Sequence, residues 1–150
     1  MSYDELMVVW YGLLFGIMGI LGVVIESLAA SVKSGRWVYR GNKYWRGLPF
    51  IPMYAVGGVV MYLIMKKMIE RSAVDTILVA SLAMSIWEYV GGEFCVRVLK
   101  KRLWSYNKHW GNLGGHVSFL STSWWLVLAI AFYFLALRGV MDWEMNWRRF

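Results

Sequence analysis

Four segments of this chain are apolar over the length that a membrane-spanning helix requires. A helix needs about 20 predominantly apolar residues to cross the hydrocarbon core of a bilayer. Three of the segments contain a long uncharged run, and the remaining one contains Glu88 and Glu93. The sequence therefore predicts an all-α protein, a bundle of four transmembrane helices. We expect these helices at about residues 6–30, 48–67, 75–98 and 117–138.

The composition supports this interpretation. Of the 150 residues, 59% are hydrophobic and 17% are charged, whereas a typical soluble domain has about 45–50% and about 25%. The net charge of +7 would suggest a nucleic-acid partner in a soluble protein, but basic loops are expected in a membrane protein. We therefore expect a single integral membrane domain over residues 1–150, with the lipid bilayer and no nucleic acid as a partner. Its tail at 139–150 is expected to lie along the membrane surface or to touch a partner.

The basic residues divide unequally between the two sides of such a bundle. The first and third loops hold ten Lys and Arg residues, and the opposite side holds six. Because basic loops tend to remain in the cytoplasm, we expect these two loops to be cytoplasmic and both termini to lie outside the cell (inner) membrane. The acidic start, Asp4 and Glu5, does not fit a cleavable signal peptide.

The two basic loops share a pattern of residues. The first loop gives the series Glu26, Trp37, Tyr39, Asn42, Lys43, Tyr44, Trp45 and Leu48, and the third gives Glu93, Trp104, Tyr106, Asn107, Lys108, His109, Trp110 and Leu113. A single gap aligns the two series. The pattern predicts two tandem two-helix repeats. Because each repeat holds an even number of spans, the axis that relates them would lie along the membrane normal.

Two of the predicted helices carry a stripe of small residues that ends near a glutamate. Successive residues of a helix turn by about 100°, which places residues three or four positions apart on one face. The first helix has Gly12, Gly16, Gly19 and Glu26 on such a stripe, and the third has Ser81, Ser85, Glu88 and Gly92. Small residues allow close approach of another helix, so we expect both stripes to be packing faces and both acids to point into the bundle.

An isolated carboxylate in a membrane is unfavourable, by roughly 2.5–3.5 kcal/mol at a helix centre, and normally finds a partner. Glu93 lies four residues before Arg97, which permits a structural ion pair within the helix. For Glu26 and Glu88, two alternatives remain open: they bind a solute, cation or proton, or they tie a basic loop to the bundle. Their candidate partners in either case are Arg40, Arg46, Arg97 and His116.

The sequence lacks the patterns of the common catalytic and cofactor sites. His109 and His116, with one cysteine, Cys95, do not supply the three or four ligands of a metal site. The glycines between the histidines lack the Lys-Ser/Thr pair of a phosphate loop, and the serines after His116 do not form a nucleophile elbow. We therefore expect no metal, no cofactor and no catalytic residue, and more generally a protein that is not an enzyme.

Two stretches of the chain resemble the signatures of a known family. They are Arg40-Gly41 with Gly47-Leu48-Pro49-Phe50-Ile51-Pro52-Met53-Tyr54, and Trp104-Ser105-Tyr106 with Asn112 to Gly115, together with Glu88 and Trp124. In these residues the chain resembles the CmpB-like family of ABC-transporter type IV membrane proteins, over about residues 10–130. The chain departs from the family pattern at Leu48, Ala55 and Ser105. The resemblance implies a membrane permease that works with a separate ATPase.

Two functional hypotheses follow. In the first, the protein has a permease-like or solute-binding role, as an oligomer or with partners, and Glu26 and Glu88 form its polar centre. In the second, it is a non-catalytic accessory subunit of a larger membrane complex, in which its aromatic and glycine faces dock other helices or lipids.

Overall fold

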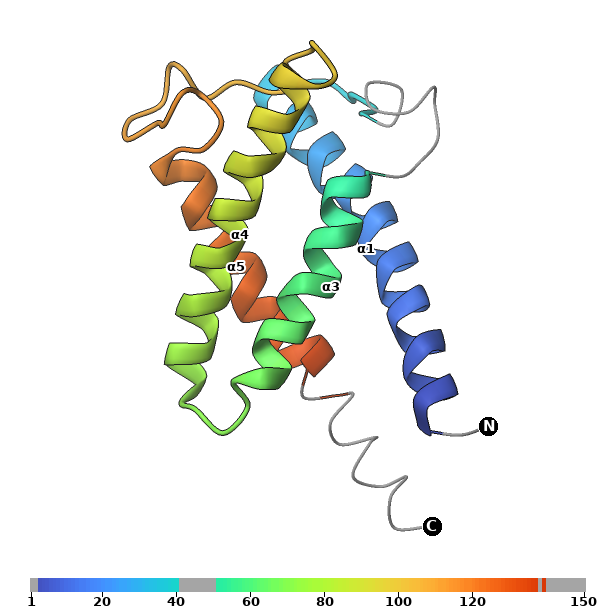
Figure 1. Ribbon diagram of the computed structural model, residues 1–150. Helices are drawn as coiled ribbons and strands as arrows, with labels where there is room; N and C mark the ends of the chain where they lie inside the picture. The colour runs from blue at the N-terminus through green and yellow to red at the C-terminus, as the bar shows by residue number, and fades with distance from the viewer. Residues whose placement is uncertain (1–2, 41–50, 138, 140–150) are drawn as a thin grey trace. The chain divides into compact units, whose positions relative to one another are not determined.

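The chain is helical throughout its regular structure. The computed structural model describes residues 3–40, 51–137 and 139, and within these it contains no strand. Its four α-helices confirm the predicted all-α class (Figure 1). They are α1 (Tyr3–Ser34), α3 (Pro52–Lys67), α4 (Ala73–Arg97) and α5 (Phe119–Phe132), and α5 continues into a π-helix, η1 (Tyr133–Leu137). Arg46 and almost all of the predicted tail at 139–150 lie outside the described residues.

Local chemistry explains where three of the helices begin. Pro52 occupies the first position of α3, where its missing N–H removes no helical hydrogen bond. Ser72 caps α4, and its side chain accepts a hydrogen bond from the backbone N–H of Asp75 at 3.0 Å. Ser118 and Ser121 form a capping box at the start of α5. These caps satisfy backbone donors that the helices themselves leave open.

Two of the helices have the length and composition of membrane spans. They are α1, of 32 residues, and α4, of 25 residues. The other two are shorter than about 20 residues: α3 has 16 residues and α5 has 14 before the π-helical segment. The prediction of a longer second helix from about residue 48 extends into 41–50, which lie outside the described residues.

The chain divides into two compact units, Met1–Val60 and Met61–Phe150. In the first unit, the C-terminal half of α1 meets the first turns of α3. The backbone N–H of Ile51 donates to the carbonyl oxygen of Gly19 at 2.9 Å. A Cβ atom added to Gly22 would lie 2.7 Å from the Tyr54 side chain, so only glycine permits this approach.

The predicted glycine stripe of α1 takes part in this contact only at one end. Gly19 is buried and accepts the hydrogen bond from α3, whereas an added Cβ at Gly12 or Gly16 would meet nothing within 4 Å among the described residues. The close approaches lie instead at Gly22, against Tyr54, and at Gly58, against Met18. The described contacts between α1 and the start of α3 therefore gather at the C-terminal end of the α1 stripe.

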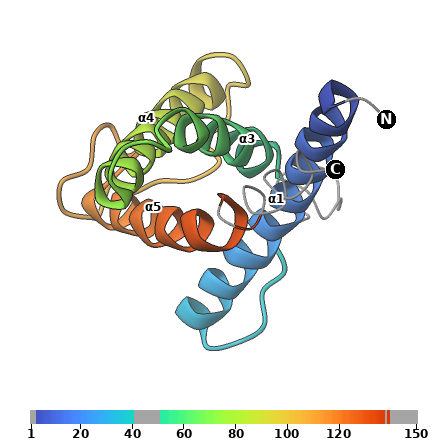
Figure 2. The same ribbon diagram turned by 90° about the horizontal axis from the view of Figure 1, so that it is seen from below.

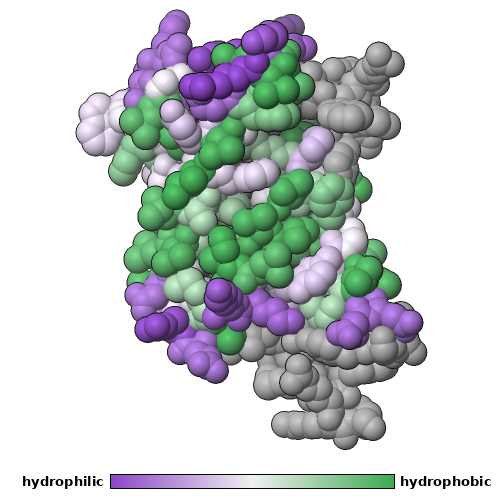
Figure 3. Space-filling view, viewed as in Figure 1, coloured by the Kyte–Doolittle hydropathy of each residue, from purple (hydrophilic) through white to green (hydrophobic). Residues whose placement is uncertain are grey.

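In the second unit, α4 packs along α5 as a hairpin, and residues 98–118 connect the two helices (Figures 1 and 2). Helix α4 buries several polar residues beside apolar ones such as Ala80 and Met84, and it exposes large apolar residues. Its buried face includes Thr76, Ser81, Ser85, Glu88 and Gly92. Its exposed face includes Leu78, Val79, Leu82, Ile86, Val90 and Phe94. Figure 3 shows this hydrophobic surface with hydrophilic residues beyond its two ends.

A helix that is apolar along its whole exposed face is stable in lipid and unfavourable in water. Buried polar groups need hydrogen-bond partners in either solvent, but an apolar outer surface that extends along a whole helix is favoured only against acyl chains. The exposed face of α1 is also apolar, from Val8 to Val32. The lengths and the apolar exposed faces of α1 and α4 therefore point to a membrane protein.

The glycine contact between α1 and α3 can be tested with two alanine variants of α1. We expect Gly22→Ala to destabilise the protein by about 1–3 kcal/mol, the usual effect of overpacking, because the new methyl group would displace Tyr54. Gly12→Ala is the matched control, with open space around it, and should leave stability unchanged or raise it by about 0.5–1 kcal/mol. Thermal unfolding in detergent, followed by size-exclusion chromatography, measures both. Equal effects of the two variants would contradict the contact.

Candidate functional site

The two predicted acids lie in different units, and a tyrosine hydroxyl donates to each. In the first unit, Tyr54 of α3 donates to Glu26 Oε1 at 3.2 Å. The next residue, Ser27, is buried, and its Oγ accepts a hydrogen bond from the backbone N–H of Arg40 at 3.0 Å. This bond holds the chain after α1 beside the Glu26 turn. Arg40 Nε is buried and has no hydrogen-bond partner among the described residues.

In the second unit, Glu88 is the centre of a polar cluster. Its carboxylate is only 7% exposed and receives hydrogen bonds on both oxygens. The hydroxyl of Tyr106, in the α4–α5 connection, donates to Oε1 at 2.9 Å, and the indole Nε1 of Trp125, in α5, donates to Oε2 at 3.2 Å. Nearly one turn earlier, Ser85 donates to Thr122 of α5 at 3.2 Å. The cluster therefore joins α4, α5 and their connection.

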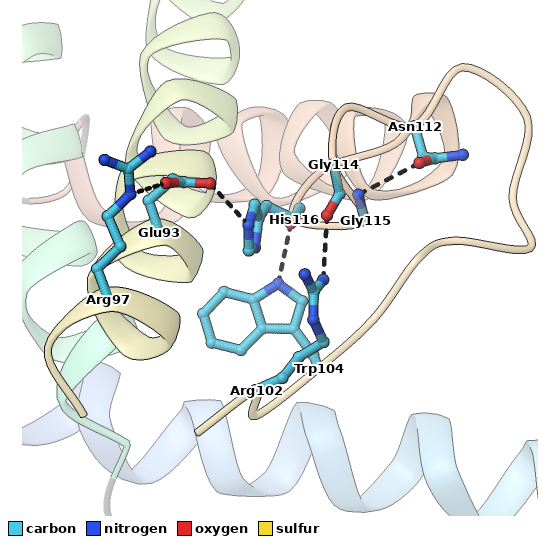
Figure 4. Close-up of polar contacts among 8 residues, drawn as sticks. All are labelled: Glu93, Arg97, Arg102, Trp104, Asn112, Gly114, Gly115 and His116. Atoms are coloured by element: carbon cyan, nitrogen blue, oxygen red, sulfur yellow. Dashed lines mark hydrogen bonds and ion pairs between the residues drawn. The ribbon is translucent and has the colours of Figure 1, made fainter. Parts of the chain in front are cut away.

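The connection at residues 98–118 owes its shape to glycines and one asparagine. Gly111, Gly114 and Gly115 all have positive φ angles, which side-chain-bearing residues rarely adopt. The side-chain oxygen of Asn112 accepts a hydrogen bond from Gly115 N at 3.2 Å (Figure 4). Tyr106 N donates to Gly115 O at 2.9 Å. This last bond places the Tyr106 side chain over the glutamate.

A second cluster anchors the end of this connection to α4. His116 Nε2 lies 3.0 Å from Glu93 Oε1, and Arg97 Nε bonds the other oxygen of the same carboxylate (Figure 4). The indole of Trp104 donates to the carbonyl oxygen of His116 at 2.9 Å. His116 is buried against Gly92, where an added Cβ would lie 2.4 Å from its Nδ1. Gly92 thus makes room for the imidazole.

These contacts assign partners that differ in part from the sequence-based candidates. Arg97 and His116 both contact Glu93, whereas the candidate partners of Glu88 included these two residues and no aromatic residue. Among the contacts of the described residues, Tyr106 and Trp125 donate to Glu88, and Tyr54 donates to Glu26. A buried Tyr or Trp usually places its polar atom against an acceptor, and this tendency is the signal that sequence reasoning did not use.

The Tyr106 and Trp125 donors at Glu88 are neutral, so these two hydrogen bonds stabilise the carboxylate without adding a positive charge. Such a group can accept a proton or attract a cation within the membrane. Among the described residues, no group of three or more His, Cys, Asp or Glu side chains is placed to hold a metal ion.

A family model described as "Putative ABC-transporter type IV" matches residues 13–148, which contain both acids and the α4–α5 connection. No curated protein and no solved structure matches the chain.

The conformation of the connection can be tested at its glycines. A Cβ atom on Gly115 would lie 1.9 Å from Asn107 Oδ1, so we expect Gly115→Ala to unfold the connection. Gly111→Ala is the control, because Gly111 has a similar positive φ but only ordinary contacts around its Cβ position. Limited trypsin digestion in detergent measures the effect at Lys101, Arg102 and Lys108. Cleavage should be much faster in the Gly115 variant than in the Gly111 variant, and equal rates would contradict the structure of the turn.

Proposed function

The chain belongs to the family described as "Putative ABC-transporter type IV", and we propose that it is a permease-like membrane subunit that binds a solute cation or proton at Glu88. Family membership supports a transport-related role in a membrane. The apolar outer faces of α1 and α4 support the same location. The specific role of Glu88 is our proposal.

The observation that carries this proposal is the burial of Glu88 within three converging elements. A carboxylate that served only to cap a loop could lie at the membrane surface, where water would solvate it. Glu88 lies instead nine residues before the end of α4, is 7% exposed, and is held by donors from α5 and from the connection. An acid at such a position in a membrane helix is most often functional.

The size of the chain supports a role within an assembly. Two of the four helices in the described residues are shorter than a membrane span, and a chain of 150 residues cannot easily enclose a wide pathway. The sequence has no phosphate loop, so ATP hydrolysis would come from a separate chain. We therefore propose that the subunit acts as an oligomer or with other subunits in the cell membrane.

The proposal predicts that ion flux depends on the charge of Glu88. In vesicles reconstituted with the detergent-extracted assembly, Glu88→Gln should reduce the flux of sodium ions or protons to the level of empty vesicles. The amide keeps the shape of the side chain but removes its charge. Fluorescent indicators for sodium and for pH, enclosed in the vesicles, measure the flux.

Two controls make this result specific. Glu70→Gln removes an exposed carboxylate from the turn between α3 and α4 and should not change flux. Size-exclusion chromatography should show the same assembly for both variants. Wild-type flux no greater than that of empty vesicles, or unchanged flux in Glu88→Gln, would overturn the proposed role of Glu88.

A second candidate function is an accessory subunit that docks other helices. It is favoured by two glycines of α1 that no described residue approaches. Gly12 and Gly16 form a GxxxG pair, and no described residue would touch a Cβ placed on either. In membranes, such a pair lets a second helix approach closely. The partner helix would belong to another copy of this chain or to a different subunit.

The composition of the native assembly separates the two candidates. Extraction in a mild detergent followed by native mass spectrometry should give either a symmetric oligomer of this chain or a complex with an ATPase, if the permease-like role is correct. Gly16→Leu should dissociate the assembly, because the larger side chain would block helix approach. A stoichiometric complex with membrane subunits alone, without an ATPase and without flux, would establish the accessory role instead.

A further inference from the structure

The connection between α4 and α5 carries a concentrated positive charge on its surface. No acidic residue occurs between Phe94 and Ser118. Five basic residues do occur there, and all are exposed: Arg97, Lys100, Lys101, Arg102 and Lys108. Of these, Arg97 is paired with Glu93, and Arg102 donates to the carbonyl oxygen of Gly114 at 3.1 Å. The three lysines remain directed to the surroundings.

The N-terminal end of α4 is nearly balanced in charge. Residues 66–75 contain three basic residues and two acidic ones, Glu70 and Asp75. The two ends of α4 therefore differ strongly in electrostatic potential, although both adjoin the same apolar surface. The concentrated positive charge is therefore specific to the connection and is not found at both ends of α4.

Large apolar side chains are exposed on the same connection and at the first residue of α5. Trp110 is 81% exposed, and Leu113 and Phe119 are more than half exposed. The rings of Trp110 and Phe119 meet edge to face, with centroids 5.4 Å apart, and Phe119 N donates to Trp110 O. Leu113 N donates to Val117 O at 3.0 Å. Backbone hydrogen bonds thus fix the chain that carries these apolar side chains.

Rigid apolar side chains beside lysines match the boundary between headgroups and acyl chains. Trp at this depth places its ring among the lipid carbonyls, and lysines attract phosphate groups when the lipid is anionic. A water-exposed loop would gain nothing from displaying Trp110 and Leu113. We infer that the α4–α5 connection is a docking surface for anionic phospholipid headgroups, with Trp110, Leu113 and Phe119 inserted at the interface and Lys100, Lys101 and Lys108 facing the phosphates.

This surface is separate from the proposed transport role. Its lysines are exposed and do not contact Glu88, and the tests below measure lipid association rather than flux. A failure of one proposal therefore leaves the other standing.

Lipid selectivity tests the lysines. The wild-type protein, reconstituted in mixed bilayers, should hold spin-labelled phosphatidylglycerol in preference to spin-labelled phosphatidylcholine, as measured by the immobilised fraction in electron paramagnetic resonance spectra. The double variant Lys101→Gln with Lys108→Gln should lose most of this preference. The matched control, Lys67→Gln with Arg71→Gln, removes the same charge from the opposite end of the hairpin and should keep it.

The effects of salt and of free phosphate on the lipid preference test whether it arises from binding of lipid headgroups. The preference should weaken as ionic strength rises, because exposed charges are screened. Millimolar inorganic phosphate at constant ionic strength should not abolish it, since the apolar side chains also require a lipid. Competition by free phosphate that removes the preference would overturn the lipid as the occupant.

The depth of Trp110 provides a second test that does not depend on the lysine variants. In protein labelled with 5-fluorotryptophan, the fluorine resonance that disappears in Trp110→Phe identifies Trp110. A nitroxide attached to the lipid headgroup should broaden this resonance strongly. A resonance that is insensitive to the nitroxide would place Trp110 away from the bilayer, against water or a partner protein, and would overturn the inference. The inference would also be overturned if Lys101→Gln with Lys108→Gln and the control, Lys67→Gln with Arg71→Gln, lost the lipid preference equally.

Discussion

The hydrogen bonds to the Glu88 carboxylate hold the second unit together. Charge cannot be left unsolvated in the interior of a membrane protein, so a buried carboxylate requires donors from the protein itself. Tyr106 and Trp125 supply them, and in doing so they fix α5 and the connection against α4. Nearly one turn away, the Ser85–Thr122 hydrogen bond joins the same two helices. One buried acid thus links α4 to α5 and to the connection between them.

The folded connection is the means by which Tyr106 reaches that acid. Its positive-φ glycines turn the chain back, and the bond from Tyr106 N to Gly115 O closes the turn. His116 then anchors the end of the connection to Glu93, at a place where Gly92 leaves space for the ring. A loop of this length in water would be variable and mobile. In this protein, polar contacts at both ends of the connection fix its conformation. Its outer surface carries lysines and aromatic rings.

The sequence predicted the helices well and the hydrogen-bond partners of the acids less well. The 100° rotation of a helix placed Ser81, Ser85, Glu88 and Gly92 on one face, and the structure buries all four. On α1 the same rule was ambiguous, because two rows of residues lead to Glu26. One row runs through Gly12, Gly16 and Gly19, and the other through Met18 and Gly22. In the structure, the close contacts with α3 lie on the second row and at Gly19.

The partners of the acids were beyond the reach of a linear pattern. Opposite charge is the simplest criterion for pairing, and it pointed to arginines and to His116. It identified Glu93 with Arg97, where four residues of one helix set the distance. It did not identify Tyr54, Tyr106 or Trp125, because their hydroxyl and indole groups are brought to the acids by tertiary contacts between elements. The tandem repeat of the two basic loops stays a prediction.

By itself, the sequence determined the physical class of this protein: apolar segments of membrane length, few charges, and small polar residues at helical spacing are properties of residues close together in the chain. The tertiary structure decided which side chains complete each buried carboxylate and which glycines face a neighbour. The reason is physical, since a membrane sets the length and outer polarity of every helix, whereas hydrogen bonds between helices depend on the rotation and depth at which they pack.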